Sequence, residues 1–414
     1  MKLLTFLGTG NYQETTYCWG EMCHASRYCP AALVHFFRPE WTLVGLTEAA
    51  QAMHFEPLTA EIKPVTQVTP VSILEGKSEA ELWAIFDILT TQFAEGDELI
   101  VDLTHGFRSL PFLGFLAVAY LRIARRVNVH GVYYGAWEAR DKDTNRAPVF
   151  DLTPFVALLD WTIAADRFER LGDAGDLARL LRDKMPPGPL MGVDEQARAL
   201  GNSLKQAAEA METVSLALRL NRPFESMEAG QNLIEALARH RAEVERQSRP
   251  FAVLADRILA AYRPFALAGP LDRANWRQNL AIQLALIGWY LDKGQVVQAV
   301  TLAREWLVSV LVYRLGVESM TSYERNRQWV ENALNNEVER HKPEPREPLP
   351  TPLDEPFRAL PQHETLGRLW TRLGDLRNDV AHVVGKLTAA DVQRKARALY
   401  DELRPLGDEL LAQP

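Results

Sequence analysis

Short apolar runs alternate with helical patterns over residues 1–150 of the chain. Apolar and β-branched residues dominate six runs that fit strands: 2–7, 15–19, 42–47, 65–73, 98–103 and 129–134. Apolar positions with helical spacing fill four segments between them: 31–36, 48–55, 79–93 and 110–126. A polar stretch at 135–148 predicts a hairpin tip. Strands that alternate with helices predict an α/β fold with a mostly parallel, doubly wound sheet.

Helical patterns replace the strand signals after residue 154. They predict helices at 158–173, 176–184, 195–220, 226–245, 250–262, 280–291, 296–315, from 363 onward, and at 389–403. The segment 337–356 carries six prolines among charged residues, so we expect a surface loop or a partly disordered insertion there. The helix pairs on either side of this segment predict a four-helix bundle.

Composition adds limits to this picture. A chain of 414 residues with 47% hydrophobic content predicts two or three domains with sizeable cores. We find no basic and apolar leader before 2–7 and no apolar run near the roughly 20 residues that span a bilayer, so we expect a cytoplasmic protein without a membrane anchor. The net charge of −8 argues against broad electrostatic binding of long nucleic acid, because counterion release needs many basic residues on one face.

The three cysteines lie close together, at Cys18, Cys23 and Cys29, with His24 beside the second. Their spacing could be drawn as a zinc site, but it lacks the short Cys pair followed by a distant second pair that zinc sites usually have. We therefore expect no metal site. The cysteines are better interpreted as reduced, half-buried thiols near the end of a hairpin.

Two polar loops follow predicted strands. The strand at 2–7 ends in Gly8-Thr9-Gly10-Asn11, and the strand at 98–103 ends in a motif that reads Asp102-Leu103-Thr104-His105-Gly106-Phe107-Arg108. Loops at the carboxyl ends of parallel strands bind ligands in open α/β sheets, and these loops offer backbone N–H groups, hydroxyls and a guanidinium to phosphates or bases. A lone Gly-Thr-Gly also fits an ordinary turn, and His105 could instead bond the backbone of its own loop.

Residues 377–382 read Arg-Asn-Asp-Val-Ala-His within a helical pattern. Arg377 and His382 are about one and a half helical turns apart, so both can reach one pocket. A guanidinium can hold an anionic phosphate while an imidazole moves a proton, and together they can break a phosphodiester without a metal. The alternative is that Arg377 is a solvated helix charge and His382 a helix C-terminal histidine close to Gly385.

The segment 6–12 and the motifs at 102–106 and 377–382 together resemble the CRISPR-associated proteins that join a CARF domain to a HEPN ribonuclease domain. The motifs occur in the same order and at a plausible distance, whereas the middle, 160–270, matches only as helices. The resemblance implies an accessory effector of a type III CRISPR system. It also implies three domains, which are a Rossmann-like CARF domain at 1–155, a helical linker domain at 156–270 and a HEPN four-helix bundle at 271–414.

In such proteins the CARF dimer binds a cyclic oligoadenylate, which is an allosteric activator rather than a cofactor; we expect cyclic tetra-adenylate here and no cofactor. The resemblance implies that the activator contacts Gly8, Thr9, Gly10, Asn11, Asp102, Thr104, His105, Gly106, Phe107 and Arg108. The ligand is expected to lie across a two-fold axis of a homodimer, or of a higher oligomer built from it.

The resemblance further implies that the HEPN dimer cleaves single-stranded RNA with Arg377, Asn378 and His382. One His382 would act as base on the ribose 2′-hydroxyl and the other as acid on the 5′-oxygen, while Arg377 stabilises the charge on the phosphorane. Asn378 either holds the histidine or the phosphate, or only caps a turn. The products would be 2′,3′-cyclic phosphates, and DNA, which lacks the hydroxyl, would survive.

Two other classes of protein compete with this interpretation. The first is a non-catalytic CARF regulator that senses a ligand and acts on a partner through its helical part. The second is a dinucleotide-dependent enzyme, but Gly8-Thr9-Gly10 lacks the third glycine of the dinucleotide fingerprint, and no acidic residue follows at the expected strand end.

Overall fold

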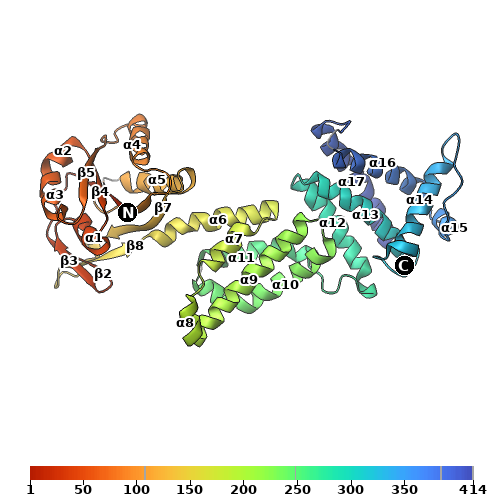
Figure 1. Cartoon of the computed structure of the whole chain (residues 1–414), viewed down its shortest axis with the longest axis horizontal. Helices are drawn as coiled ribbons and strands as arrows, with labels where there is room; N and C mark the ends of the chain where they lie inside the picture. Colours follow the sequence, from red (N-terminus) through yellow and green to blue (C-terminus); the bar gives the residue numbers. More distant parts are fainter. Residues whose placement is uncertain (107–108, 248, 383–384, 413–414) are drawn as a thin grey trace. The chain divides into compact units, whose positions relative to one another are not determined.

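The computed structural model describes residues 1–106, 109–247, 249–382 and 385–412 (Figure 1). The chain divides into two compact units, Met1–Asp160 and Trp161–Pro414. Helix α6, Thr153–Leu171, spans this division, and the predicted domain boundary at 155 falls within it. The second unit holds both predicted helical domains around one shared hydrophobic core. The predicted split near residue 270 stays a prediction.

The first unit is built on an eight-stranded sheet in the order β3-β2-β8-β7-β6-β1-β4-β5. The strands are β1 Lys2–Leu7, β2 Thr15–Trp19, β3 Met22–Ser26, β4 Trp41–Leu46, β5 Gln67–Ser72, β6 Glu98–Asp102, β7 Asn128–Gly135 and β8 Arg146–Asp151. Strands β5, β4, β1, β6 and β7 are parallel, while β8 is antiparallel to β7 and β3 is antiparallel to β2. The predicted α/β unit with a mostly parallel sheet is confirmed.

Helices cover both faces of this sheet. They are α1 Cys29–Phe37, α2 Glu48–Ala50, η1 Gln51–Phe55, α3 Glu56–Ile62, α4 Glu79–Thr91, α5 Leu110–Ala124 and η2 Trp137–Ala139. Alternate side chains of β1 enter different cores: Leu3 and Leu7 pack with α1 and α3, whereas Leu4 and Phe6 pack with α4 and α5. This two-residue alternation is what a strand buried on both faces requires.

The second unit is helical. Its elements are α7 Gly175–Arg182, α8 Gly188–Val193, α9 Glu195–Arg219, α10 Pro223–Gln247, α11 Arg249–Tyr262, η3 Arg263–Phe265, η4 Arg273–Asn275, α12 Trp276–Asp292, α13 Val296–Arg314, η5 Tyr323–Arg327, α14 Gln328–Arg340, α15 Asp354–Arg358, α16 His363–Ala381 and α17 Ala389–Ala412. Helix α13 packs against α12, α16 and α17, and α17 also packs against α12 and α16. The two predicted helix pairs therefore pack on one another.

The proline-rich segment begins later than predicted, because α14 continues to Arg340 and the first proline of the segment is Pro343. Glu337, the predicted start of the loop, is a buried helical residue whose carboxylate accepts hydrogen bonds from His363 Nδ1 at 2.9 Å and Arg340 Nη1 at 3.0 Å. The remaining segment is held in place, since Asn336 bonds both the N–H and the carbonyl of Leu349. The short α15 also lies inside the predicted loop.

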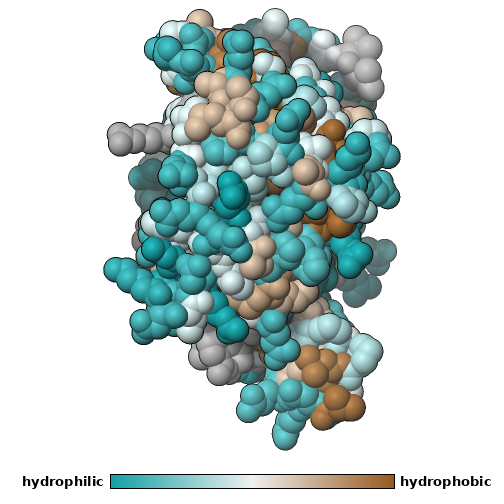
Figure 2. All heavy atoms as spheres, turned by 90° about the vertical axis from the view of Figure 1, so that its left-hand side faces the viewer, coloured by the Kyte–Doolittle hydropathy of each residue, from teal (hydrophilic) through white to brown (hydrophobic). Residues whose placement is uncertain are grey.

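Helix α13 is long and apolar enough, by length and composition, to cross a membrane. This departs from the expectation that no segment reaches that length. Trp306, Leu307 and Val310 are nevertheless fully buried in the core of the second unit, as a core helix of this composition would be. Figure 2 shows one face of the molecule, on which hydrophilic side chains predominate.

Candidate functional site

The two predicted polar loops line one cleft in the first unit. Strands β1 and β6 are parallel neighbours, with Leu4 opposite Val101, so the loops that follow them leave the same edge of the sheet. The cleft has a volume of about 470 Å³ and we call it the sheet-edge cleft. Seven of the predicted residues line it: Gly8, Thr9, Gly10, Asn11, Thr104, His105 and Gly106. Phe107 and Arg108 lie outside the described residues.

Asp102 lies behind the cleft and is fully buried. Its carboxylate accepts hydrogen bonds from the Thr5 hydroxyl at 2.7 Å, from the Thr104 N–H at 3.0 Å, and from the Thr104 hydroxyl. The Thr104 hydroxyl in turn accepts a bond from the Gly135 N–H at 2.8 Å. Burial raises the pKa of Asp102, and the bonds from Thr104 and Thr5 oppose this rise. Asp102 and Thr104 therefore fix the loop that follows β6 to the neighbouring strand.

His105 is bonded to the first turn of α1 rather than to its own loop. Its Nε2 accepts the Cys29 N–H at 3.1 Å, which leaves the proton of the neutral ring on Nδ1. Burial, assisted by nearby His54, lowers the pKa of His105 to about 3. The ring is therefore neutral at physiological pH and acts as an acceptor that connects two segments of the unit.

Tyr12 closes the first loop, and the sequence pattern did not indicate it. Its hydroxyl accepts the Gly8 N–H at 2.8 Å and donates to the Gly8 carbonyl at 3.2 Å. Its ring lies between His105 and His54, at centroid distances of 4.2 and 4.7 Å. The loop is thus held in shape by one side chain that bridges its ends.

Other residues of the sheet-edge cleft were also missed: Gln13, Tyr17, Arg27, Tyr134, Gly135, Trp137 and Glu138. Residues 134–138 follow β7, which is next to β6, so the predicted strand at 129–134 was a usable signal for them. Arg27 follows β3, a strand that was not predicted. Exposed side chains of the lining include Thr9, Asn11 and Arg27, and Arg27 supplies a positive charge that could bind an anion, with Glu138 as an exposed carboxylate in the same lining.

The cysteines depart from the prediction. Cys18 and Cys23 do lie in a hairpin, but they face each other across β2 and β3 and form a disulfide, so the expectation of reduced thiols is wrong for this pair. Cys29 is a free thiol that is fully rather than half buried, and burial raises its pKa. The spacing along the chain did not reveal the strand pairing. Within the described ranges, no group of three His, Cys, Asp or Glu side chains is placed to hold a metal ion.

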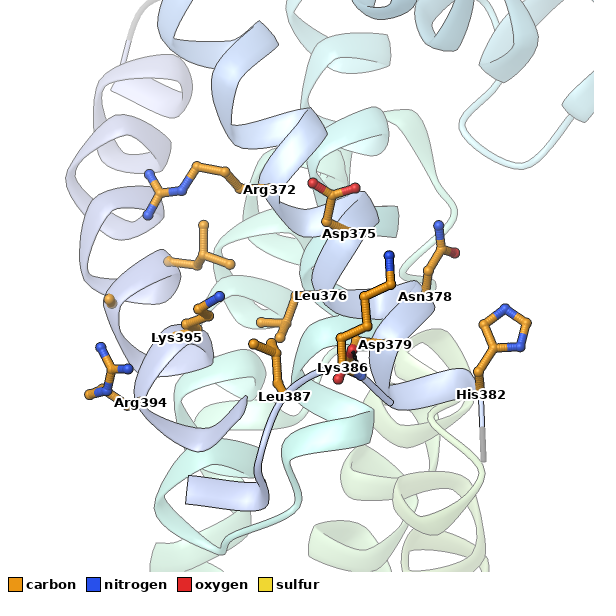
Figure 3. A pocket seen from close by; sticks show the side chains of 12 residues that line it. Arg372, Asp375, Leu376, Asn378, Asp379, His382, Lys386, Leu387, Arg394 and Lys395 are labelled. Atoms are coloured by element: carbon orange, nitrogen blue, oxygen red, sulfur yellow. Dashed lines mark hydrogen bonds between the residues drawn. The ribbon is translucent and has the colours of Figure 1, made fainter. Parts of the chain in front are cut away.

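A second cleft lies in the second unit, between the end of α16 and the first turns of α17 (Figure 3). It has a volume of about 780 Å³ and we call it the α16–α17 cleft. Helix α16 ends at Ala381, and His382 adopts an extended backbone (φ −101°, ψ 136°) at the helix end. Asn378 and His382 both line this cleft and both are exposed.

Arg377 is exposed and does not line the α16–α17 cleft. Its Nη1 donates to the Asn378 side-chain oxygen at 3.3 Å, and the role of Asn378 stays a prediction. His382 lies beyond the last helical residue in an extended conformation, so the helical spacing to Arg377 does not bring both side chains into this cleft. In the single chain, the arrangement is that of a solvated helix charge and a helix C-terminal histidine.

Asp379 ties down the segment after α16. Its Oδ1 accepts the Lys386 N–H at 2.6 Å, and a Cβ atom at Gly385 would lie 3.0 Å from its Oδ2. The carboxylate therefore fixes the backbone of Lys386, and a side chain at residue 385 would have to displace it slightly. Asp379 lies inside the motif at 377–382, but the sequence pattern gave it no role.

No protein-family model matches the chain. The chain is similar to a curated relative, CRISPR-associated protein MJ1674 of Methanocaldococcus jannaschii, with 29% identity over 144 residues. The match covers 34% of this chain and 22% of the relative, so it spans less than a quarter of the relative's length. This likeness supports the CRISPR-associated part of the resemblance and leaves the activity to be tested.

Proposed function

We propose that the protein is a cyclic-oligoadenylate-activated, metal-independent endoribonuclease of type III CRISPR defence that joins a CARF domain to a HEPN domain. The observation that carries the proposal is the exposed end of α16, where His382 and Asn378 line a cleft and Arg377 lies beside them. Similarity to a CRISPR-associated protein supports it.

The catalytic unit we propose is a homodimer, in which the second copy supplies what one chain lacks. A two-fold axis near the α16 end would bring two copies of Arg377 and His382 around one scissile phosphate. One neutral His382 would take the proton of the 2′-hydroxyl, and the other, protonated, would give a proton to the departing 5′-oxygen. Arg377 would stabilise the extra charge on the phosphorane. The products are RNA ends with a 2′,3′-cyclic phosphate and a 5′-hydroxyl.

The sheet-edge cleft is the proposed activator site. Its loops carry backbone N–H groups at 9–11 and 105–106, beyond the N–H groups of Gly8 and Thr104 that are bonded to Tyr12 and Asp102, and Arg27 adds a positive charge beside them. A cyclic oligoadenylate, with cyclic tetra-adenylate as the expected form, carries one phosphate for each nucleotide and can span two such clefts in a dimer. Binding shifts the arrangement of the two helical bundles only by its differential affinity for their states. The setting of this activity is the cytoplasm.

The test is cleavage of a quenched fluorescent single-stranded RNA by the full chain. We expect weak cleavage alone, strong cleavage with cyclic tetra-adenylate, no effect of EDTA, and no cleavage of the matching DNA. Equal rates with and without every cyclic oligoadenylate from three to six units would contradict the activation. Tight binding of an activator without any RNA cleavage would instead favour the non-catalytic regulator.

A further inference from the structure

The α16–α17 cleft has a basic wall that the catalytic proposal does not use. Four basic side chains line it, Arg372, Lys386, Arg394 and Lys395, against two carboxylates. Two of the four are already paired, because Arg372 binds Glu402 through two contacts of 2.5 and 2.8 Å and Arg394 binds Asp391 at 2.6 Å. The free positive charge of the wall therefore resides on the two lysines.

Lys386 and Lys395 form no ion pair within 4.0 Å with any residue in the described part of the chain. Figure 3 shows Lys386 extending from the loop before α17 toward Asp375 and Asn378, and Lys395 extending from α17 toward α16. The backbone of Lys386 is fixed, because its N–H is bonded to Asp379. Asp375 and Asp379 line the same cleft, but neither forms an ion pair with either lysine, so both ammonium groups keep their capacity to bind an anion.

The floor of the same cleft is apolar. Leu376 and Leu399 are almost fully buried at 3% and 4% exposure, and Leu387 and Ala398 complete the surface. An apolar floor with a cationic rim matches a nucleotide, whose base has apolar faces and whose phosphate is an anion. The cleft volume of about 780 Å³ lies within the range of about 300–1,000 Å³ that is usual for small-molecule sites.

We propose that the α16–α17 cleft is a nucleotide subsite for single-stranded RNA beside the scissile bond. Lys386 and Lys395 bind the phosphate of a flanking nucleotide, and Leu387 and Ala398, the accessible part of the apolar floor, contact its base. The inference rests on the proposed ribonuclease function and adds a local grip on the substrate. Such a local cluster of positive charge would let a chain with a net charge of −8 bind an anionic strand.

The direct test measures RNA binding with the catalytic histidine removed, so that no strand is cut. In the His382→Ala background, the double variant Lys386→Gln, Lys395→Gln should weaken binding of a fluorescent single-stranded RNA about tenfold by anisotropy. The slope of log K against log salt should become shallower by about 0.7 to 1.4, because one or two phosphate contacts are lost. The matched control is Lys184→Gln, Lys205→Gln, which removes two exposed lysines elsewhere in the same unit, one in the turn after α7 and one on α9, and should change neither quantity. Unchanged affinity and slope in the cleft variant would overturn the subsite.

Kinetics with activator provide the second test. The cleft variant with His382 intact should show a raised KM, about tenfold, and a kcat within about twofold of the parent, since lost uniform binding raises KM alone. A dinucleotide substrate should be cleaved equally by variant and parent, because it has no flanking nucleotide. A fall in kcat with unchanged KM would overturn the proposal. If the parent cleaves no RNA but lysine-dependent binding persists, the ribonuclease function fails and the subsite stands.

Discussion

The two clefts differ in how their polar groups are satisfied. In the sheet-edge cleft, Asp102, Thr104 and His105 are bonded to other parts of the same unit, and Tyr12 bridges the ends of its own loop. In the α16–α17 cleft, Lys386, Lys395 and His382 project from exposed positions. The polar groups of the first cleft are thus held by bonds within one chain, whereas those of the second are exposed at its surface.

This difference indicates how the polar groups of each cleft are held in place. A preformed site binds its ligand without a further ordering cost, since its loops were fixed during folding. In the dimer that we propose, the exposed groups of the second cleft would gather only in one arrangement of the two copies. The proposed activator would then control the second cleft by favouring that arrangement.

The largest expected effect is on catalysis. His382→Ala should lower RNA cleavage by about 10²–10⁴-fold, because it removes the proposed proton carrier, and Arg377→Ala should come close to it. The melting temperature should barely change, since both side chains are exposed. Single-turnover rates with saturating activator are the measurement, and Arg368→Ala, an exposed arginine earlier on α16, is the control. Near-parent turnover in His382→Ala would show that the second cleft is no active site.

The next effect is on the stability of the sheet-edge cleft. Asp102→Ala should destabilise the first unit by about 1–3 kcal/mol, because the buried Thr104 N–H and the Thr5 hydroxyl lose their acceptor. Urea unfolding followed by circular dichroism measures the loss. Asp102→Asn retains one acceptor oxygen and should lose less. If both variants had the same free energy of unfolding as the parent, the bonds of Asp102 would not hold the first cleft in shape.

The third effect depends on pH. The pKa of His105 is about 3 in the folded unit and about 6.5 when unfolded, so the unfolded chain binds the extra proton between these values. Stability from this residue is present above pH 6.5 and falls as the pH drops toward 3, by about 2 kcal/mol between pH 7.5 and pH 5. His105→Gln, which can still accept the Cys29 N–H, should lack this part of the acid sensitivity. If the free energy of unfolding of parent and variant depended on pH in the same way, the pKa of His105 would not be lowered by folding.

The smallest effect concerns Asp379, which accepts the backbone N–H of Lys386. Asp379→Ala frees the Lys386 N–H and should lower kcat about tenfold with little change in activator binding, since a misplaced histidine transfers protons poorly. Asp379→Asn retains an acceptor for that N–H and should restore most of the rate. A raised KM with an unchanged kcat would contradict a positioning role. Equal rates in the alanine and asparagine variants would contradict it as well.

The sequence predicted the elements whose burial leaves a simple pattern. Strands β1, β4 and β6 are apolar runs with both faces covered, and they lie where expected. Strand β3 was missed because its side chains are mostly exposed, and β8 because it begins within a polar segment and contains Pro148. The end of α14 was misjudged because a buried Glu337 looks like a surface charge until its partners are known.

The same limit applies to the clefts. The loops at 8–11 and 102–106 were predicted to meet, since both follow strands of a parallel sheet. Arg27 and Glu138 join them only through the strand order, which the sequence does not contain. Lys386 and Lys395 were likewise invisible, because their cleft depends on how α16 and α17 pack. Local sequence patterns indicate the chemistry of one segment, whereas the neighbours of a residue from other segments depend on tertiary packing.

The bonds that hold Asp102 and Thr104 behind the sheet-edge cleft also divide its residues into a frame and a replaceable lining. Thr9, Asn11 and Arg27 carry exposed side chains, so changes at these positions alter what the cleft recognises at little cost to folding. Such a layout favours rapid divergence. For the proposed activator site, substitutions at these positions would change the preferred ligand while the frame stays the same.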